Sequence, residues 1–332
     1  MGYTYKDSGV DINAGEETVE KIKPLVKSTH NDKVLSNIGL FGGFYEADFG
    51  DIKKPVLVSS VDGVGTKLKV AFMTGIHNTV GQDLVNHCVD DILCCGAKPL
   101  YFMDYFATGK LETDVAVKVI EGFVKACKEN NTALIGGETA EMPSIYSDGE
   151  YDMSGTIIGV VDKDKIVDGS KIKADDVLIG LKSSGLHTNG YSLARNVLFS
   201  KYKHDDKPES LGGKTIGEAL LEIHVSYFNE VHPLADQKLL NGISHITGGG
   251  IIGNTKRILP NDLELNIDWD SWERPPLFKL IQETGNVEES EMRNAFNLGV
   301  GMILVVSKEN VDHVMEATKK WDSFVMGSIN KR

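Results

Sequence analysis

The chain has 332 residues, of which 41% are hydrophobic and 25% are charged, and its formal net charge at pH 7 is −13. This length is typical of two domains, and the composition is that of a globular protein. So acidic a surface repels nucleic-acid phosphates and anionic lipid, and we therefore expect neither as the main partner.

The cysteines and the N-terminus indicate a reducing compartment. None of the four cysteines forms a C-x-x-C pair, so a disulfide framework is not expected. Met1–Gly15 is polar and lacks the apolar core of a signal peptide. No apolar run approaches the roughly 20 residues that a membrane-spanning helix needs. We expect a cytoplasmic protein.

In the first half of the chain the hydrophobic pattern predicts helices and strands in alternation. In chain order these are a helix around Val19–Val26, a strand at Val56–Val61, an amphipathic helix at Thr79–Cys95, a strand at Tyr101–Phe106, a helix at Asp114–Lys128, and strands at Ala133–Ile135 and Thr156–Val161. The strand that ends at Ile135 is expected to break at the following glycine pair, Gly136-Gly137.

The charged, turn-rich stretch Asp162–Asp176 is where we expect the domain boundary, which divides the chain into residues 1–168 and 169–332. The pattern beyond it predicts strands and helices again. The strands are Val177–Leu181, Gly301–Val306 and Phe324–Ile329, and the helices are Leu193–Phe199 and Ile216–Phe228. Strands mixed with helices in both halves favour two α/β domains.

A glycine loop, Asp62-Gly63-Val64-Gly65-Thr66-Lys67, follows the first strand. Its glycines allow backbone N–H groups to approach an anion closely. Lys67 would neutralise phosphate charge, and Asp62 would hold a divalent cation that bridges phosphates. An ordinary glycine turn is the alternative.

The amphipathic helix that follows has a strongly polar face. At 100° per residue, one arc holds five polar side chains: Asp83, Asn86, His87, Asp90 and Asp91. Carboxylates on one stripe repel one another, and a bound cation would relieve that repulsion. The alternative is a solvated face.

Gly136-Gly137-Glu138-Thr139-Ala140-Glu141 follows a buried strand. Ligands bind at the carboxyl ends of strands in open α/β sheets. Glu138 and Glu141 supply the hard oxygen atoms that suit Mg²⁺. The start of a helix with favourable acids is the alternative.

Two glycine-bordered segments lie in the second half. Ser183–Tyr191 gathers hydroxyl, amide and imidazole groups before a helix, which suits either a sugar phosphate or a helix cap. His245–Gly253 contains the pattern G-x-G-x-x-G. A dinucleotide fold needs a long helix after it, but Pro260 limits that helix to about two turns. Gly213-Lys214-Thr215 is not a Walker loop, because Pro208 occupies its first glycine position.

Taken together, six segments resemble the aminoimidazole ribonucleotide synthetase family over nearly the whole chain, from Tyr5 to Ile329. They are Tyr5–Ile12, Asp62–Lys67, Asp104–Lys110, Gly136–Pro143, Ser183–Leu193 and His245–Gly250. The chain departs from the family pattern at Asp90, where Asn is frequent, and at Cys94-Cys95.

The resemblance implies two α/β domains and a homodimer whose N-terminal sheets join in a barrel, with a C-terminal mixed sheet and its helices. It also implies an ATP-dependent cyclo-ligase of purine biosynthesis that needs Mg²⁺. Such an enzyme converts formylglycinamidine ribonucleotide to aminoimidazole ribonucleotide, ADP and phosphate through an iminophosphate.

The expected roles follow from the chemistry of the motif residues and of Asp91 on the polar helix face. The metal would bind Asp62, Asp91 and Glu141. ATP would contact the loop residues Asp62, Gly63, Gly65, Thr66 and Lys67 and the second set Gly136, Gly137 and Glu138. The substrate would contact His187, Asn189, Gly248 and Gly249. Of the two expected catalytic residues, His245 would stabilise or protonate the activated amide oxygen, and Lys67 would meet phosphate oxygens.

Other members of the same superfamily are the nearest alternatives: selenophosphate synthetase, thiamine-monophosphate kinase and a hydrogenase-maturation enzyme. Selenophosphate synthetases carry Cys or selenocysteine near the N-terminus, whereas the first cysteine here is Cys88. A catalytically inactive nucleotide-binding regulator is a different class of alternative. The motif acids, Lys67 and His245 are all present, and this favours an enzyme.

Overall fold

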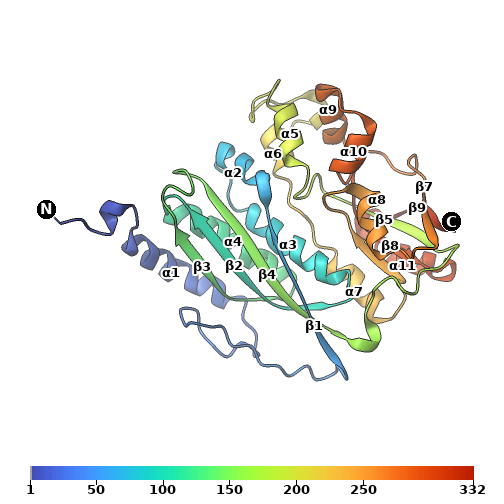
Figure 1. Cartoon of the computed structure of the whole chain (residues 1–332), viewed down its shortest axis with the longest axis horizontal. Coiled ribbons are helices and arrows are strands. Elements are labelled where there is room, and N and C mark those ends of the chain that lie inside the picture. Colours follow the sequence, from blue (N-terminus) through green and yellow to red (C-terminus); the bar gives the residue numbers. More distant parts are fainter. Residues whose placement is uncertain (1) are drawn as a thin grey trace.

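The computed structural model describes residues 2–332 and contains two β-sheets, each with its own helices (Figure 1). The first sheet has four strands in the order β1-β4-β2-β3, and the second has five in the order β6-β8-β5-β9-β7. The two sheets occupy separate stretches of the chain, before and after Lys163–Asp176. Both halves are therefore α/β, as predicted.

The first sheet is mixed. Its strands are β1 (Pro55–Gly63), β2 (Lys98–Thr108), β3 (Ala133–Glu141) and β4 (Tyr151–Asp162). β2 and β3 are parallel, because α4 (Thr113–Glu129) crosses between them, and the other pairs are antiparallel. α3 (Val80–Leu93) and α4 lie behind the sheet in Figure 1, and α1 (Ile12–Lys27) packs on α4 beside β3. The short α2 (Leu68–Thr74) follows the glycine loop.

The expected break of β3 at Gly136-Gly137 is wrong. β3 continues to Glu141 and pairs with β2 on both sides of the glycine pair, with a bulge in β3 at Ile135, which has no partner between Phe102 and Met103 of β2. Gly137 lies opposite Asp104, and a Cβ on it would stand 2.2 Å from the Asp104 carboxylate. The glycine is thus needed for a close approach within a strand rather than for a turn, and the alternative of a helix start at Glu138 fails with it.

The outer face of the first sheet carries no helix (Figure 1). Leu57, Val61 and Met103 point outward and are 61%, 65% and 38% exposed. Their neighbours on the helix side, such as Phe102 and Ile157, are fully buried. The alternation along β1 and β4 therefore separates a core face from an exposed, partly apolar face.

The second sheet is wholly antiparallel, so the expected mixed sheet is wrong. It consists of β5 (Val177–Lys182), β6 (Gly242–His245), β7 (Leu263–Ile267), β8 (Val300–Val306) and β9 (Phe324–Lys331). Its helical crossovers join strands that are not neighbours. For example, α11 (Val311–Ala317) leads from β8 to β9, and β5 lies between those two strands.

The helices of the second half are short. They are α5 (Tyr191–Leu198), α6 (Ile216–Leu220), α7 (Phe228–Asp236), α8 (Gly250–Thr255), α9 (Pro276–Gly285), α10 (Glu289–Ala295) and α11. α8, the helix after the G-x-G-x-x-G pattern, has 6 residues, which confirms that no dinucleotide-type crossover follows it.

The expected helix Ile216–Phe228 is wrong beyond α6. The segment 221–227 runs extended between α6 and α7, along the polar face of α3. There the backbone N–H groups of His224 and Tyr227 donate to the Asp83 and Asp90 carboxylates at 2.7 and 3.0 Å. Tertiary hydrogen bonds thus replace those of a helix, which propensity along the chain does not anticipate.

The polar face of α3 is buried rather than solvated. Asp83 and Asp90 have no exposed surface, and Asn86 and His87 are nearly as buried. This face meets the second half of the chain along a polar seam between the two sheets, whereas the opposite face packs on β1 and β4. Among the described residues, no helix has both the length and the apolarity to cross a membrane.

Candidate functional site

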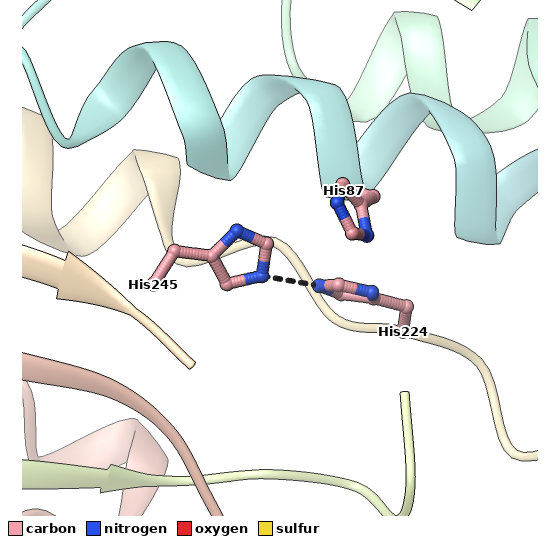
Figure 2. A group of neighbouring side chains, drawn as sticks. All are labelled: His87, His224 and His245. Carbon is pink, nitrogen blue, oxygen red and sulfur yellow. Dashed lines mark hydrogen bonds between the residues drawn. The ribbon is translucent and has the colours of Figure 1, made fainter. Parts of the chain in front are cut away.

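Six side chains from both halves of the chain converge at one end of the polar seam. Asp62 comes from β1, and His87 and Asp91 lie one turn apart on α3. Thr188 lies in the loop before α5, His224 in the extended segment 221–227, and His245 at the end of β6. Figure 2 shows the three histidines pointing toward one another from these separate segments.

Asp62 and Asp91 are the two carboxylates of this group. The ligand atoms of Asp62, His87 and Asp91 all lie within 4.8 Å of one another. Asp91 accepts hydrogen bonds from Ser60 Oγ at 2.9 Å and lies 2.9 Å from His245 Nδ1. Its side chain is 29% exposed and that of Asp62 is 42% exposed, so both carboxylates are open to a ligand.

A continuous chain of polar contacts links Asp62 to Asp91. Asp62 Oδ2 lies 2.7 Å from His87 Nε2, and His87 Nδ1 lies 2.7 Å from Thr188 Oγ1. The same hydroxyl lies 3.3 Å from His224 Nδ1, and His224 Nε2 lies 3.1 Å from His245 Nε2. His245 Nδ1 completes the chain to Asp91.

The number of protons in this chain follows from its ends. Both ends are carboxylates, which only accept. Five hydrogen bonds need five protons, and the four neutral groups between the ends carry one each. All five contacts are therefore hydrogen bonds only when this row of side chains holds one additional proton.

The environment places that proton on His87. Burial opposes its charge, but the bond to Asp62 and the negative charge of Asp91 raise the pKa of His87 above its ordinary value. Burial lowers the pKa of His224 far below the usual range. Burial also lowers the pKa of His245, but by less, because the hydrogen bond to Asp91 opposes the shift. Asp62 responds in the opposite sense: its bond to His87 overcomes burial and lowers its pKa. An imidazolium at His87 between neutral rings and ionised acids satisfies all five contacts.

Lys67 does not reach this group of side chains. Its side chain is fully buried, and Nζ lies 2.8 Å from Asp83 and donates to the carbonyls of His187 and Glu222 at 3.2 and 2.6 Å. Burial lowers the pKa of Lys67 and raises that of Asp83, while their mutual attraction opposes both shifts. The cation that relieves the acidic stripe of α3 is thus the protein's own, and the structure gives Lys67 no open path to a phosphate.

The glycine loop around Lys67 is more open. Gly65 and Thr66 are exposed, and the Thr66 hydroxyl lies 3.1 Å from that of Ser192 at the start of α5. The Gly63 N–H donates to Asp62 at 2.7 Å. These residues therefore border the seam beside Asp62.

The expected substrate residues fall into two groups. His187 is buried, with its ring stacked on that of His224 at 4.0 Å between centroids, and its Nδ1 has no hydrogen-bond partner. Asn189 lies at the mouth of the loop, next to Gly248, whose Cβ position would stand 3.3 Å from the Asn189 amide oxygen. Gly249, at the start of α8, is exposed. Asn189, Gly248 and Gly249 thus share one rim, whereas His187 lies beneath it.

The remaining expected nucleotide residues line a separate cavity. Gly136, Gly137 and Glu138 border a space of about 350 Å³ between α1, β3 and the loop 37–43. Asp104 also lines it, and burial, reinforced by the charge of Glu138, raises the pKa of Asp104 to about 7. The pairing register sets Asp62, Gly155, Asp104 and Gly137 on one line across the sheet, about 14 Å from end to end.

Glu141 lies apart from the other two expected metal ligands. Its carboxylate accepts from the Asp11 and Leu111 backbone N–H groups at 2.6 and 2.7 Å. It is not part of the group that Asp62, His87 and Asp91 form. In this chain Glu141 ties the start of α1 to the strand β3.

Three side chains of the cluster were not among the expected site residues. His87 carried a signal, because it precedes Asp91 by one helical turn on the polar face. Thr188 lies inside a segment that was identified, between His187 and Asn189. His224 carried no signal, because its segment is expected to be helical and contains no motif.

Comparisons with known proteins agree with the two-part architecture. Residues 48–161 match the family model described as the AIR synthase related protein N-terminal domain, and residues 173–332 match the corresponding C-terminal domain. A phosphoribosylformylglycinamidine cyclo-ligase of Sorangium cellulosum is 50% identical, over 99% of this chain and 96% of its own. One of Pseudothermotoga lettingae is 48% identical over 99% and 97%.

Solved structures share the fold at low sequence identity. A thiamine-monophosphate kinase from Stenotrophomonas maltophilia superposes with a TM-score of 0.68, at 14% identity and 94% coverage of both chains. The hydrogenase maturation protein HypE in complex with ATP gives a TM-score of 0.65 at 14% identity, over 96% of this chain and 86% of its own. This likeness is one of fold.

Proposed function

Because the chain belongs to the AIR synthase family of phosphoribosylformylglycinamidine cyclo-ligases, we propose that the site at the seam performs that reaction. The enzyme is an ATP-dependent ligase of purine biosynthesis. It converts formylglycinamidine ribonucleotide to aminoimidazole ribonucleotide and releases ADP and phosphate. The observation that carries the proposal is the convergence of Asp62, Asp91 and His245 from three distant parts of the sequence.

The proposed reaction activates an amide oxygen and then displaces it. The γ-phosphoryl group of ATP passes to the formyl oxygen of the substrate and forms an iminophosphate. The amidine nitrogen attacks the adjacent carbon, phosphate leaves, and the nitrogen gives up its proton as the ring closes. Since the nucleophile belongs to the substrate, the protein contributes mainly orientation, worth up to about 7–11 kcal/mol in favourable intramolecular cases.

The chemistry of the donors fits a magnesium ion. Asp62 and Asp91 present ionised, half-open carboxylates close together, and Mg²⁺ prefers such oxygen atoms. When bound there, the ion would neutralise phosphate charge. Glu141 lies apart from these two carboxylates, and we therefore do not assign it to the ion.

His245 is the residue that we assign to the amide oxygen. The Asp91 carboxylate fixes its ring through Nδ1, and the neighbouring His224 shares a proton with Nε2. A ring held in this way can donate a proton to, or accept one from, an atom that takes the place of His224 at Nε2. The half-open rim of Asn189, Gly248 and Gly249 beside it would receive the ribose phosphate.

The test is turnover with formylglycinamidine ribonucleotide and ATP, with the product detected as a diazotisable amine and ADP measured in parallel. His245→Ala should reduce cyclisation about 10²–10⁴-fold and leave ATP binding intact. The exposed His313 provides the matched control, since His313→Ala should turn over normally. Normal turnover by His245→Ala would remove this residue from the reaction, and no ADP release by the unmodified chain would refute the function.

We further propose that the protein acts as a homodimer whose first sheets face each other. The exposed Leu57, Val61 and Met103 on the helix-free face support this arrangement. A second subunit also accounts for the separation between Asp62 and the cavity at Gly136–Glu138. Inside one domain the Phe102 ring fills the space over Gly155, between Asp104 and Asp62, and blocks a nucleotide there. Sedimentation should show a dimer that Val61→Lys weakens.

The domain boundary and the location complete the proposal. We place the boundary between residues 168 and 169, within the connection that joins the two sheets. The four cysteines are free thiols, which supports a reducing compartment such as the cytoplasm.

A further inference from the structure

The three histidines of the seam form a nearly symmetrical group (Figure 2). The ring centroids of His87, His224 and His245 are separated by 5.1, 4.9 and 5.1 Å, with angles of 63°, 69° and 62° between ring planes. One nitrogen from each ring lies within 4.8 Å of the other two, and all three residues are buried.

We propose that His87, His224 and His245 form a binding site for a zinc-type divalent ion, separate in its donor set from the carboxylate pair that suits magnesium. Zn²⁺ is bound tetrahedrally at about 2.0–2.1 Å by imidazole nitrogens, which places neighbouring ligand nitrogens about 3.3 Å apart. His224 Nε2 and His245 Nε2 are already 3.1 Å apart. The third ligand nitrogen, that of His87, lies within 4.8 Å of the other two and would move closer when an ion binds.

The far nitrogens of the three rings support the same assignment. A metal-binding histidine typically has its other ring nitrogen hydrogen-bonded, which fixes the ring and increases its donor strength. His245 Nδ1 meets Asp91, His224 Nδ1 meets Thr188, and His87 meets Asp62 through one nitrogen and Thr188 through the other. Each ring therefore has an orienting partner, whichever nitrogen of His87 binds.

The donor types separate this site from the magnesium site. Three buried imidazoles suit Zn²⁺, Co²⁺ or Ni²⁺ and are poor ligands for Mg²⁺, which prefers carboxylate oxygens. Binding displaces the protons held between the rings to solvent. An ion there occupies His245 Nε2, the atom that the proposed function assigns to the substrate. Zinc should thus inhibit the enzyme, and only this consequence rests on the proposed function.

The test is a Co²⁺ titration of the full-length protein in excess Mg²⁺ without nucleotide, followed by visible absorption and then by displacement with Zn²⁺. The unmodified chain should bind one Co²⁺ with the intense bands of a tetrahedral nitrogen site. His224→Gln should bind at least about tenfold more weakly, while His313→Gln, on the surface, should bind like the unmodified chain. Absence of the bands in the unmodified chain, or an unchanged affinity in His224→Gln, overturns the proposal.

A second readout covers a variant that folds poorly. Zn²⁺ should raise the thermal midpoint of the unmodified chain, because the ligands come from both halves of the structure. It should raise the midpoints of His224→Gln and His87→Gln much less, and circular dichroism checks that both are folded. A full shift in both variants contradicts the site. A chain that binds cobalt but does not cyclise its substrate refutes the function alone, and one that cyclises but binds no cobalt refutes the metal site alone.

Discussion

The polar face of α3 divides into two rows of side chains that have different fates. Asp83, Asn86 and Asp90 are buried and bind the backbone of the segment 222–227 or the ammonium of Lys67. His87 and Asp91, a fraction of a turn away, open toward Asp62 and His245. One row holds the two halves of the molecule together, and the other carries chemistry.

The difference between the rows lies in their partners and not in their residue types. Asp83 accepts from the His224 N–H through one oxygen and contacts the buried Lys67 ammonium through the other, and it has no exposed surface that a ligand could reach. Asp91 keeps part of its surface exposed and contacts a histidine that can exchange its proton. Burial therefore distinguishes a structural acid from a functional one on the same helix.

The strongest challenge to this division is the removal of one buried charge. Asp83→Asn keeps the shape but leaves the Lys67 ammonium buried without its counter-ion. We expect a loss of about 3–5 kcal/mol in the free energy of unfolding, measured by urea denaturation. The double variant Lys67→Met/Asp83→Leu, which buries no charge, should lose less than the two single changes together. A loss below about 1 kcal/mol in Asp83→Asn would show that the pair does not hold the seam.

How much of this arrangement the sequence predicts depends on the distance over which each contact acts. The periodicity of 80–93 predicts α3 and its polar face, which includes Asp91, and the motif segments include Asp62 and His245. Neither shows that Lys67 turns inward, because its partner Asp83 lies on a different element. The segment around His224 is misjudged for the same reason, since its hydrogen bonds go to α3 and not to its own neighbours. The local pattern of residues predicts the helices and strands. Hydrogen bonds and ion pairs between distant elements decide which of their side chains are structural and which are functional.

The functional row is tested by the corresponding change at Asp91. Asp91→Asn removes the charge that orients His245 and one of the two carboxylates suited to Mg²⁺. We expect kcat/KM to fall about 10–100-fold and the Mg²⁺ concentration needed for half-maximal activity to rise. The free energy of unfolding should change little. Asp164→Asn, on an exposed carboxylate that pairs with Lys54, is the control and should leave both unchanged. A large loss of stability with normal kinetics would place Asp91 in the structural row.

Asp104 extends the comparison to a half-buried carboxyl whose pKa is affected by the charge of another acid, Glu138. Its pKa is raised from 3.8 to about 7, so the neutral form is favoured in the folded state. A raised carboxyl pKa costs stability as the pH rises from the unfolded value toward the folded one. Because the cavity admits solvent, we expect about 1–2 kcal/mol of the difference to survive.

The measurement is urea denaturation of Asp104→Asn and the unmodified chain at pH 4.5 and pH 8. The variant should gain stability relative to the unmodified chain between these two values, since the amide has no proton to lose. An equal pH dependence of the two proteins would mean that the Asp104 carboxyl ionises as freely as an exposed one.

The smallest effect is expected where the two halves of the molecule are joined at the surface. Lys165 lies 2.5 Å from Asp236 of α7, so this pair bridges the two halves directly. Lys67 and Asp83 both belong to the first half, and Lys67 reaches the second half through the carbonyls of His187 and Glu222. The side chains of Lys165 and Asp236 are 36% and 52% exposed, whereas those of Lys67 and Asp83 are fully buried. Water and salt screen an exposed pair, so Lys165→Ala should cost less than about 1 kcal/mol, and 1 M salt should abolish that difference. A loss as large as that of Asp83→Asn would mean that contact between the halves, and not burial of the charge, determines what an ion pair contributes to this seam.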